Sequence, residues 1–296
     1  MSNNPLISVF MPVYNGEQYL SKSIESVLNQ SLKDFELVCV DDSSTDNSYN
    51  QLLEYAKKDK RLIVLRKTNG GSVPISWNYA MQYLSGKFIT YMSQDDWMSG
   101  DNLQLNYSRY LETGANIIVP DLISCSEHKV FKNLCGINGD RNLVLTGKQA
   151  FIYSLNWKIH GFNLCEAKIM KSESFDENFF NSDEYITRNN FLISSTVAFS
   201  SGKFYYYQGN PNAITKKFGI KTITALGTDQ KIIQLIKKEK LSNKITFMFI
   251  LKSMIRLIYY YFRWLKTYSK SNEHNKLAFE LMKKHFVFLK RSIRFY

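Results

Sequence analysis

The first hundred residues alternate between short, continuously apolar runs and segments with the apolar spacing of a helix. The runs "LISVFMPVY", "FELVCV", "RLIVL" and "KFITYM" each have the length of a strand. Between them, segments such as "GEQYLSKSIESVLNQS" repeat apolar residues three and four positions apart. Continuously apolar strands separated by helices are typical of a parallel sheet covered on both faces. We therefore predict an α/β fold with a Rossmann-like, mostly parallel sheet.

The pattern continues less clearly beyond residue 100. Residues 121–145 are polar and show no periodicity, so we predict an irregular segment there that carries specificity. The stretch "TVAFSSGKFYYYQG" predicts two short strands joined at Ser201-Gly202. Apolar spacing predicts helices at residues 102–114, 147–157 and 182–194 and from about residue 226 onward.

The positive charge is concentrated at the C-terminal end. The formal net charge is +12, yet residues 240–296 contain 13 Lys and Arg against only Glu273 and Glu280. The rest of the chain, residues 1–239, is therefore nearly neutral. This argues against a basic nucleic-acid groove there, so we expect no nucleic-acid partner. A basic, aromatic C-terminal segment suggests adhesion to something anionic.

The C-terminal segment predicts two amphipathic helices, near residues 245–265 and 276–294. Their apolar faces could pack on the body or on a second subunit, but their basic polar faces favour an anionic membrane surface. Because Lys252, Arg256 and Arg263 interrupt the apolar runs, we expect no transmembrane segment. The residues predicted to share the apolar face of the first helix are Phe247, Ile250, Leu251, Met254, Ile258, Tyr261 and Leu265.

The four cysteines have no CxxC spacing, and no signal-peptide pattern precedes the first apolar run. We therefore expect a cytoplasmic protein that is peripheral on the inner face of the cell membrane.

Two acidic pairs follow predicted strands. Asp41 and Asp42 end one strand, and Asp95 and Asp96 end another, so both pairs should lie at the carboxyl edge of the sheet, where such folds bind ligands. Asp and Ser residues at these positions could simply cap helices. Two adjacent carboxylates repel each other, however, which favours a ligand site over capping alone. A Mg or Mn ion held by one or two carboxylates would recognise a diphosphate.

A third acidic pair, Asp183 and Glu184, precedes Arg188 in "NSDEYITRN". Glu184 and Arg188 are four residues apart on one predicted helix face, so a surface ion pair worth a few tenths of a kcal/mol is an equal alternative to a functional role.

The ordered set of these motifs resembles family 2 glycosyltransferases. The stretches "ISVFMPVYNGEQYLSKSIESVLNQSLKDFELVCVDDSSTDNS" and "NGGSVPISWNYAMQYLSGKFITYMSQDDW" resemble the nucleotide-sugar half of that family over residues 6–98. The stretches "SFDENFFNSDEYITRN" and "KFYYYQGNPNAITK" resemble, more weakly, the acceptor half of bacterial enzymes that build capsule or lipopolysaccharide glycans.

The resemblance implies a GT-A fold. The glycosyltransferase domain would span residues 1–225, with a nucleotide-sugar half at 1–120 and an acceptor half at 121–225. A basic amphipathic helical extension would occupy residues 226–296.

The resemblance also assigns roles to individual residues. Asp95 would meet the diphosphate-bound Mn or Mg, with Asp96 as support or second ligand, although the family's usual Asp-x-Asp is Ser93-Gln94-Asp95 here. The residues implied to bind the nucleotide sugar are Pro12, Tyr14, Asn15, Asp41, Asp42, Asn69, Asn78, Gln94 and Asp95.

The catalytic base would come from the pair Asp183 and Glu184, with Asp183 narrowly favoured. His160, Arg188 and Lys216 are weaker candidates for acceptor contacts. A single His is more often structural, and an exposed Lys is more often simply solvated. "YYFRW" at 260–264 resembles the QxxRW of processive synthases, but Tyr260 replaces the Gln, so we expect transfer of one sugar.

The implied activity is inverting, metal-dependent transfer of a hexosyl or N-acetylhexosaminyl group from a nucleotide sugar, with a UDP-sugar favoured. The acceptor would be a lipid-linked or growing glycan of capsule, lipopolysaccharide or exopolysaccharide synthesis. Ser93 and the inverted acidic pair leave an alternative, a catalytically degenerate, nucleotide-binding scaffold of a membrane polysaccharide-assembly complex. A nucleotidyltransferase is disfavoured because "YNGEQ" supplies no Gly-rich loop with a basic residue. The sequence leaves open whether the protein forms a homo-oligomer.

Overall fold

The computed structural model describes residues 4–268 and 273–293 and divides into two compact units. The sheet unit comprises Met1–Phe175 and Asn190–Asn210, and the helical unit comprises Asp176–Asn189 and Pro211–Tyr296. The helical unit therefore includes a short segment from the middle of the chain. The predicted boundary at residue 225 would fall inside helix α8 (Ile220–Lys238), and the domain division of the sequence analysis stays a prediction.

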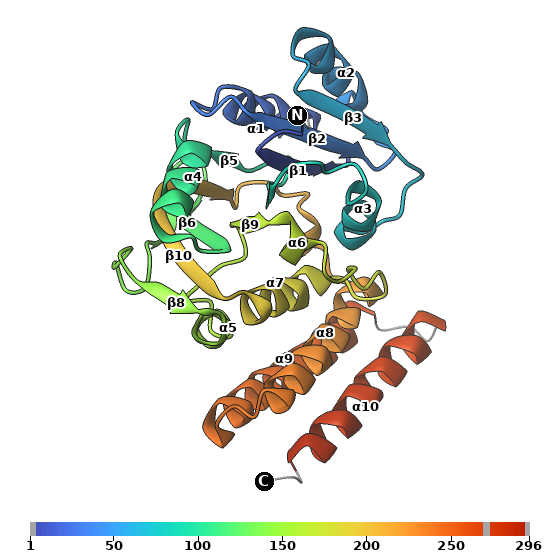
Figure 1. Ribbon diagram of the computed structural model, residues 1–296. Helices are drawn as coiled ribbons and strands as arrows, with labels where there is room; N and C mark the ends of the chain where they lie inside the picture. Colours follow the sequence, from blue (N-terminus) through green and yellow to red (C-terminus); the bar gives the residue numbers. More distant parts are fainter. Residues whose placement is uncertain (1–3, 269–272, 294–296) are drawn as a thin grey trace. The chain divides into compact units, whose positions relative to one another are not determined.

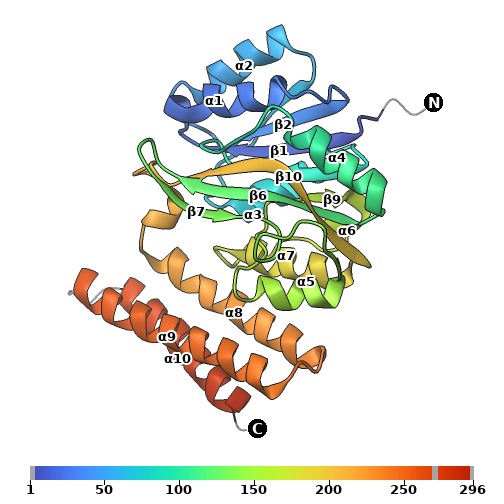
Figure 2. The same ribbon diagram turned by 90° about the vertical axis from the view of Figure 1, so that its left-hand side faces the viewer.

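The sheet unit contains ten strands in one mixed sheet (Figure 1). The parallel core joins β3, β2, β1 and β4 in that order, as continuously apolar runs predict, and β6 pairs in parallel with β10. Figure 2 shows β6 and β10 side by side. The strands are β1 (Ile7–Val13), β2 (Phe35–Asp41), β3 (Leu62–Arg66), β4 (Phe88–Tyr91), β5 (Trp97–Met98), β6 (Ile117–Cys125), β7 (Val130–Leu134), β8 (Val144–Thr146), β9 (Leu164–Glu166) and β10 (Thr196–Tyr207).

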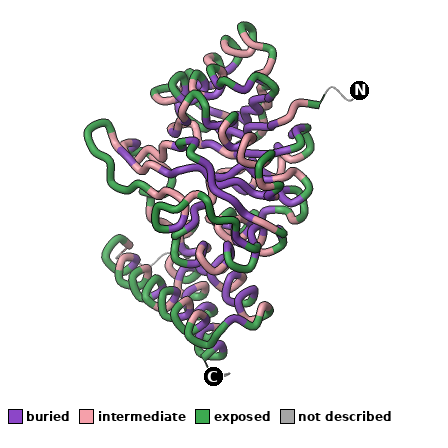
Figure 3. The backbone as a smooth tube through the Cα atoms, turned by 60° about the vertical axis from the view of Figure 1, so that its left-hand side comes forward, coloured by how far each residue is buried: buried purple, intermediate pink, exposed green. Residues whose placement is uncertain are grey.

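Helices cover both faces of this sheet. On one face, Leu20 and Ile24 of α1 and Leu103 of α4 join the main hydrophobic core. On the other face, Phe10 of β1 packs against Trp77 of α3, with ring centroids 4.4 Å apart. The helices of the sheet unit are α1 (Glu17–Leu28), α2 (Ser48–Lys58), α3 (Val73–Ala80), α4 (Asn102–Thr113), α5 (Gly147–Ser154) and α6 (Ala167–Met170). Figure 3 shows the central strands as buried, so the sheet is the rigid platform for the loops at its edge.

Two predictions about the sheet were wrong. Residues 121–145 are irregular only at 126–129 and 135–143, because β6 continues to Cys125 and pairs with β7 as a hairpin. The residues of β7 are mostly exposed and mixed in polarity, which removes the alternation that reveals a strand. The stretch from Thr196 to Tyr207 is one strand, and its pairing with β6 shifts between Phe199 and Lys203, where a bulge replaces the predicted turn.

The helical unit consists of α8, α9 (Asn243–Thr267), α10 (Glu273–Ile293) and the first part of α7 (Ser182–Ile193). Ile233 of α8, Ile250 and Leu257 of α9, and Met282 of α10 share one apolar core. The predicted apolar face of α9 was only partly right. Ile250 is buried, but Phe247, Leu251, Ile258, Tyr261 and Leu265 are exposed. Thr246 and Ser253 lie on the buried face instead.

Within the described residues, one helix, α9, is long and apolar enough to cross a membrane by length and composition alone. Core helices pass the same test, so the expectation of no transmembrane segment stays a prediction.

Candidate functional site

The loops that follow β1, β2 and β4 meet at the carboxyl edge of the parallel strands. The backbone N–H of Tyr14 donates to Gln94 Oε1 at 2.8 Å, and Gln94 Nε2 donates back to the Tyr14 carbonyl at 3.0 Å. The backbone N–H of Asn15 donates to Ser44 Oγ at 3.0 Å. A Cβ on residue 16 would lie 2.4 Å from the Gln94 amide, so a side chain there would displace the amide from its two hydrogen bonds with Tyr14. The predicted convergence of these loops is confirmed.

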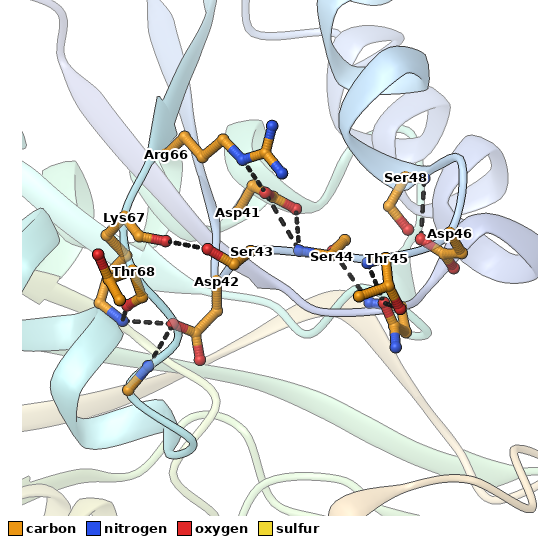
Figure 4. A network of polar contacts seen from close by, with 12 residues as sticks. Asp41, Asp42, Ser43, Ser44, Thr45, Asp46, Ser48, Arg66, Lys67 and Thr68 are labelled. Atoms are coloured by element: carbon orange, nitrogen blue, oxygen red, sulfur yellow. Dashed lines mark hydrogen bonds and ion pairs between the residues drawn. The ribbon is translucent and has the colours of Figure 1, made fainter.

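Asp41 and Asp42 are compensated by donors of the protein itself (Figure 4). Asp41 is fully buried, forms an ion pair with Arg66 at 3.2 Å and accepts from the backbone N–H of Ser44. Asp42 pairs with Lys67 and accepts from the backbone N–H groups of residues 70 and 71, at 2.8 and 3.2 Å. Both carboxylates therefore hold loops in place, Asp41 at the start of the turn to α2 and Asp42 at the loop before α3.

Asp95 and Asp96 lie in different environments at the end of β4. Asp95 is half-buried, and its Oδ2 accepts from Asn210 Nδ2 at 2.7 Å. Asp96 is fully buried, and its Oδ1 accepts from the backbone N–H of Tyr207 at 2.9 Å, whereas its Oδ2 is buried without a hydrogen-bond partner. Burial and the neighbouring Asp95 charge raise the pKa of Asp96 well above its usual value. Asp95 is the more accessible of the two carboxylates.

The donor set near Asp95 fits a cation that is shared with a substrate. No group of three or more His, Cys, Asp and Glu side chains gathers to hold a metal within the part of the chain that the structure describes. A Mg or Mn ion that takes one or two carboxylates and completes its shell with phosphate oxygens and water does not need such a group. Asp95 would supply one such carboxylate, and the buried Oδ2 of the adjacent Asp96 has no hydrogen-bond partner within the protein.

The other residues assigned to the donor are more scattered. Pro12 is half-buried within β1, and Tyr14 and Asn69 are exposed. Asn78 forms a pair of hydrogen bonds with the backbone of Phe175, both at 2.9 Å. Asn78 therefore fastens α3 to the point where the chain leaves the sheet unit.

Asp183, Glu184 and Arg188 all lie in the first turns of α7, within the helical unit. Glu184 forms an ion pair with Arg188, which is buried and also donates to the Glu184 carbonyl at 2.6 Å. Asp183 remains exposed to solvent. The protein atoms around its carboxyl, and then the charge of Glu184, raise the pKa of Asp183 to about 7. The two carboxylates thus differ, because Glu184 is paired with a cation and Asp183 carries the raised pKa.

The remaining acceptor candidates, His160 and Lys216, differ in their burial. His160 is buried, and its Nε2–H donates to the Pro120 carbonyl at 2.8 Å. Burial lowers the pKa of His160 to about 4, so the ring is neutral at pH 7. Lys216 is exposed in a short 3-10 turn at Ile214–Lys216, in the helical unit.

The sequence analysis missed an aromatic group beside the Asp96 loop. Lys22 Nζ lies 3.1 Å from the ring centroid of Trp97, whose indole stacks on Tyr205 with centroids 5.3 Å apart. Tyr207, whose backbone holds Asp96, also contacts Trp97 and Tyr19. The run of three tyrosines at the end of β10 was the available signal, but sequence alone does not indicate that β10 ends beside β5.

Comparison with known proteins identifies the family. The sequence pattern described as glycosyl transferase family 2 matches residues 8–179, more than half of the chain. The chain belongs to glycosyltransferase family 2. The resemblance stated from the sequence is thus confirmed, and the matched region contains the three strand-end loops and the Asp95 site.

The curated relatives of this family 2 chain include named glycosyltransferases. "Glycosyltransferase GlyA" of Streptococcus pneumoniae is 27% identical over 236 residues, which are 74% of this chain and 33% of the relative. The poly(ribitol-phosphate) beta-glucosyltransferase of Bacillus spizizenii is 29% identical over 68% of this chain and 32% of its own length. The chain therefore spans about a third of these two relatives. The Escherichia coli UDP-Glc:alpha-D-GlcNAc-diphosphoundecaprenol beta-1,3-glucosyltransferase WfgD is 33% identical over 45% of this chain and 57% of its own.

A solved structure confirms the predicted GT-A fold. S. aureus TarS 1–349 in complex with UDP-GlcNAc superimposes with a TM-score of 0.72 at 17% identity, covering 97% of this chain and 82% of that chain. At this identity the similarity establishes the fold alone.

Proposed function

We propose that this family 2 chain is an inverting, metal-dependent glycosyltransferase. It transfers one hexosyl or N-acetylhexosaminyl group from a UDP-sugar to a lipid-linked or growing cell-surface glycan. The observation that carries the proposal is the meeting of the loops after β1, β2 and β4, with Asp95 accessible at that edge. The edge where parallel strands end is where such sheets bind nucleotides.

The donor residues fall into two groups in this proposal. Tyr14, Asn15 and Asn69 are exposed and contact the nucleotide directly, and the Asn15 Oδ1 also accepts from the backbone N–H of Thr45 at 2.8 Å. The others shape the loops around it, because their side chains bond to the backbone or lie within the sheet: Pro12, Asp41, Asp42, Asn78 and Gln94. The choice of UDP rests on the UDP-Glc in the name of WfgD and on the UDP-GlcNAc complex of TarS.

Asp95, with Asp96 beside it, would hold a Mn or Mg ion against the diphosphate. When bound, such an ion neutralises the charge that develops on the departing nucleoside diphosphate. Asn210 orients the Asp95 carboxylate through the 2.7 Å hydrogen bond, so the chain fixes this ligand before substrate arrives.

Inverting transfer requires one base on the acceptor side. Asp183 accepts the proton of the acceptor hydroxyl while that oxygen bonds to the anomeric carbon and the bond to the diphosphate oxygen breaks. A carboxyl with a pKa near 7 is suited to this task, whereas Glu184 is held by Arg188. A positioned base contributes about 100- to 10,000-fold in rate, or roughly 3 to 5 kcal/mol of barrier.

The names of two relatives support the proposed acceptor. Two of them are named for poly(ribitol-phosphate) and for a diphosphoundecaprenol-linked sugar, which are both cell-envelope acceptors. We place this protein on the cytoplasmic face of the membrane, held peripherally by its basic C-terminal helices. His160, Arg188 and Lys216 have supporting or peripheral roles at most toward the acceptor.

Mutation of the acidic pair tests the proposal. Asp183→Asn should lower turnover by about 100-fold or more, because the base is lost while charge-independent contacts remain. Glu184→Gln should have a smaller effect. The measurement is transfer or slow hydrolysis across a panel of UDP-sugars with Mn or Mg. Asp34→Asn and Glu54→Gln, at exposed positions of the sheet unit, are the matched controls. If Glu184→Gln abolished turnover and Asp183→Asn did not, Glu184 would be the base instead of Asp183.

A second candidate is a nucleotide-binding scaffold without catalysis. It is favoured by Ser93, whose hydroxyl hydrogen-bonds Tyr91 at 2.8 Å where the family usually has a carboxylate. UDP binding without transfer or hydrolysis across the whole panel would select this candidate.

A further inference from the structure

The outward face of α9 is apolar over most of its length. Six side chains, each 42–63% exposed, form what we call the outer stripe: Met248, Leu251, Ile255, Ile258, Phe262 and Leu265. Their spacing of three and four residues places them on one side of the helix. Figure 3 shows exposed positions recurring along the helices of this unit. A continuous apolar surface of this kind marks an interaction site.

Buried polar contacts on the opposite face fix the rotation of α9. Ser253 Oγ donates to Asp229 Oδ2 at 2.8 Å and lies 2.8 Å from His285 Nε2. Arg256 pairs with the other oxygen of Asp229 at 2.6 Å, and Gln230 Nε2 lies 3.1 Å from His285 Nδ1. These contacts fit a neutral His285 with its proton on Nε2. The Nε2–H then donates to Ser253 Oγ, and Nδ1 accepts from Gln230.

The polar network explains why the outer stripe is not simply turned inward. Rolling α9 to bury the stripe would separate Ser253 and Arg256 from Asp229, and it would leave a buried carboxylate without compensation. Pulling α9 out of the unit to span a bilayer would have the same consequence for Asp229 and His285. The stripe must therefore be covered from outside, with α9 lying along the covering surface.

Charge indicates what covers the stripe. Helix α9 contains no acidic residue, and Lys244 and Lys266 lie at the two ends of the stripe. Lys252 lies along its edge and is exposed. The three- and four-residue spacing also suits a helix–helix seam, but α9 of a second copy has no acidic side chain to place against these lysines. An anionic surface pairs with them instead.

We propose that the outer stripe of α9 inserts in the plane of an anionic lipid bilayer, with the stripe in the acyl boundary and the lysines at the headgroups. This inference rests on the proposed function for its location and adds the surface and its orientation.

Vesicle sedimentation of the full chain tests the inference. The wild-type chain should bind phosphatidylglycerol vesicles at low ionic strength and bind phosphatidylcholine vesicles less. Ile255→Glu with Phe262→Glu should reduce binding to phosphatidylglycerol about tenfold or more, since two apolar contacts become anionic. Leu111→Glu, at a 64% exposed position of α4 in the sheet unit, is the matched control and should bind as wild type.

Three results would overturn the inference. The first is no vesicle binding by the wild-type chain, and the second is equal vesicle binding by the double variant. The third is a wild-type chain that does not bind vesicles but forms a concentration-dependent dimer in ultracentrifugation, which the double variant abolishes. Equal binding to both lipids would overturn the assignment of an anionic surface. Donor hydrolysis in vesicle-free solution separates the two proposals. Donor hydrolysis without vesicle binding would contradict only this inference. Vesicle binding without any donor turnover would contradict only the proposed function.

Discussion

Asp95 and Asp96 are adjacent in the chain, yet they face different surroundings. The side chain of Asp96 points into the fold, where the backbone of Tyr207 binds one oxygen. Asp95 lies at the accessible edge with Asn210. Asp95 lies in the turn after β4, where it can serve a ligand, whereas the buried Asp96 ties the same loop to β10.

Asp95→Asn should remove metal-dependent stabilisation by the donor. A neutral amide binds a hard divalent cation more weakly than a carboxylate does, so the added rise in unfolding temperature with UDP and Mn should disappear. Thermal unfolding with UDP, Mn, both and neither measures this. Asp101→Asn, at an exposed position before α4, should retain the rise. An unchanged rise with Asp95→Asn would remove Asp95 from the metal site.

Asp183 predicts opposite pH dependences for activity and stability. Its pKa of about 7 in the folded state exceeds the ordinary value of 3.8. The folded state therefore holds a proton that the unfolded state releases, so stability falls as pH rises from about 4 to about 7. Turnover rises over the same range, because only the ionised carboxylate accepts a proton.

Two measurements check this pair of trends. Asp183→Asn should unfold at a higher temperature than wild type at about pH 8, although it is nearly inactive. A rate profile that is flat down to about pH 5 would contradict the raised pKa.

At this scale the sequence predicted which strand ends carry acidic pairs, because apolar runs reveal strands and parallel topology places their ends together. It could not predict that Arg66 and Lys67 compensate Asp41 and Asp42, since this depends on β3 lying beside β2. The division of roles between Asp183 and Glu184 likewise depends on the side-chain pairing with Arg188.

Among the elements, the predictable ones are those that bury a continuous face. Strands β1, β2 and β4 and helix α1 follow directly from apolar spacing. The short strands β5 and β9 and the hairpin strand β7 are held by their neighbours in the sheet rather than by their own residues. Helix α9 has apolar residues on most of its surface, so the sequence could not show that Ser253 and Thr246 lie on the inner face.

Asp229→Ala should destabilise the helical unit by about 1 to 3 kcal/mol, because Ser253 and Arg256 lose their buried partner. Asp229→Asn keeps one acceptor for Ser253 and should cost less. Urea unfolding followed by fluorine NMR of 5-fluorotryptophan reports on Trp264, the one tryptophan of the sequence in that unit, and Trp264→Phe assigns its signal. Equal stability of Asp229→Ala and wild type would mean that the network does not hold α9.

Across the whole molecule, the donor residues and the acidic pair of α7 belong to different compact units. UDP binding should therefore be unaffected by changes in the pair. We expect Asp183→Asn and Glu184→Gln to bind UDP with Mn within about twofold of wild type, since a base contributes to the transition state and not to donor binding. Isothermal titration calorimetry measures this. A large loss of UDP affinity in either variant would mean that α7 also takes part in donor binding.

The chain leaves the sheet unit after Phe175 and re-enters it at Asn190. The exit is fixed by the paired hydrogen bonds of Asn78 and by Phe175 stacking on Trp77, with centroids 5.0 Å apart. The re-entry is fixed by Phe191, which is fully buried. The segment at residues 176–189, which contains Asp183, is thus attached to the sheet unit at both of its ends, and this limits its configurational entropy. The chain runs from the sheet unit into α8, α9 and α10 after Asn210, so a single peptide-bond cleavage at residues 211–219 would separate these helices from the part of the chain that contains Asp183.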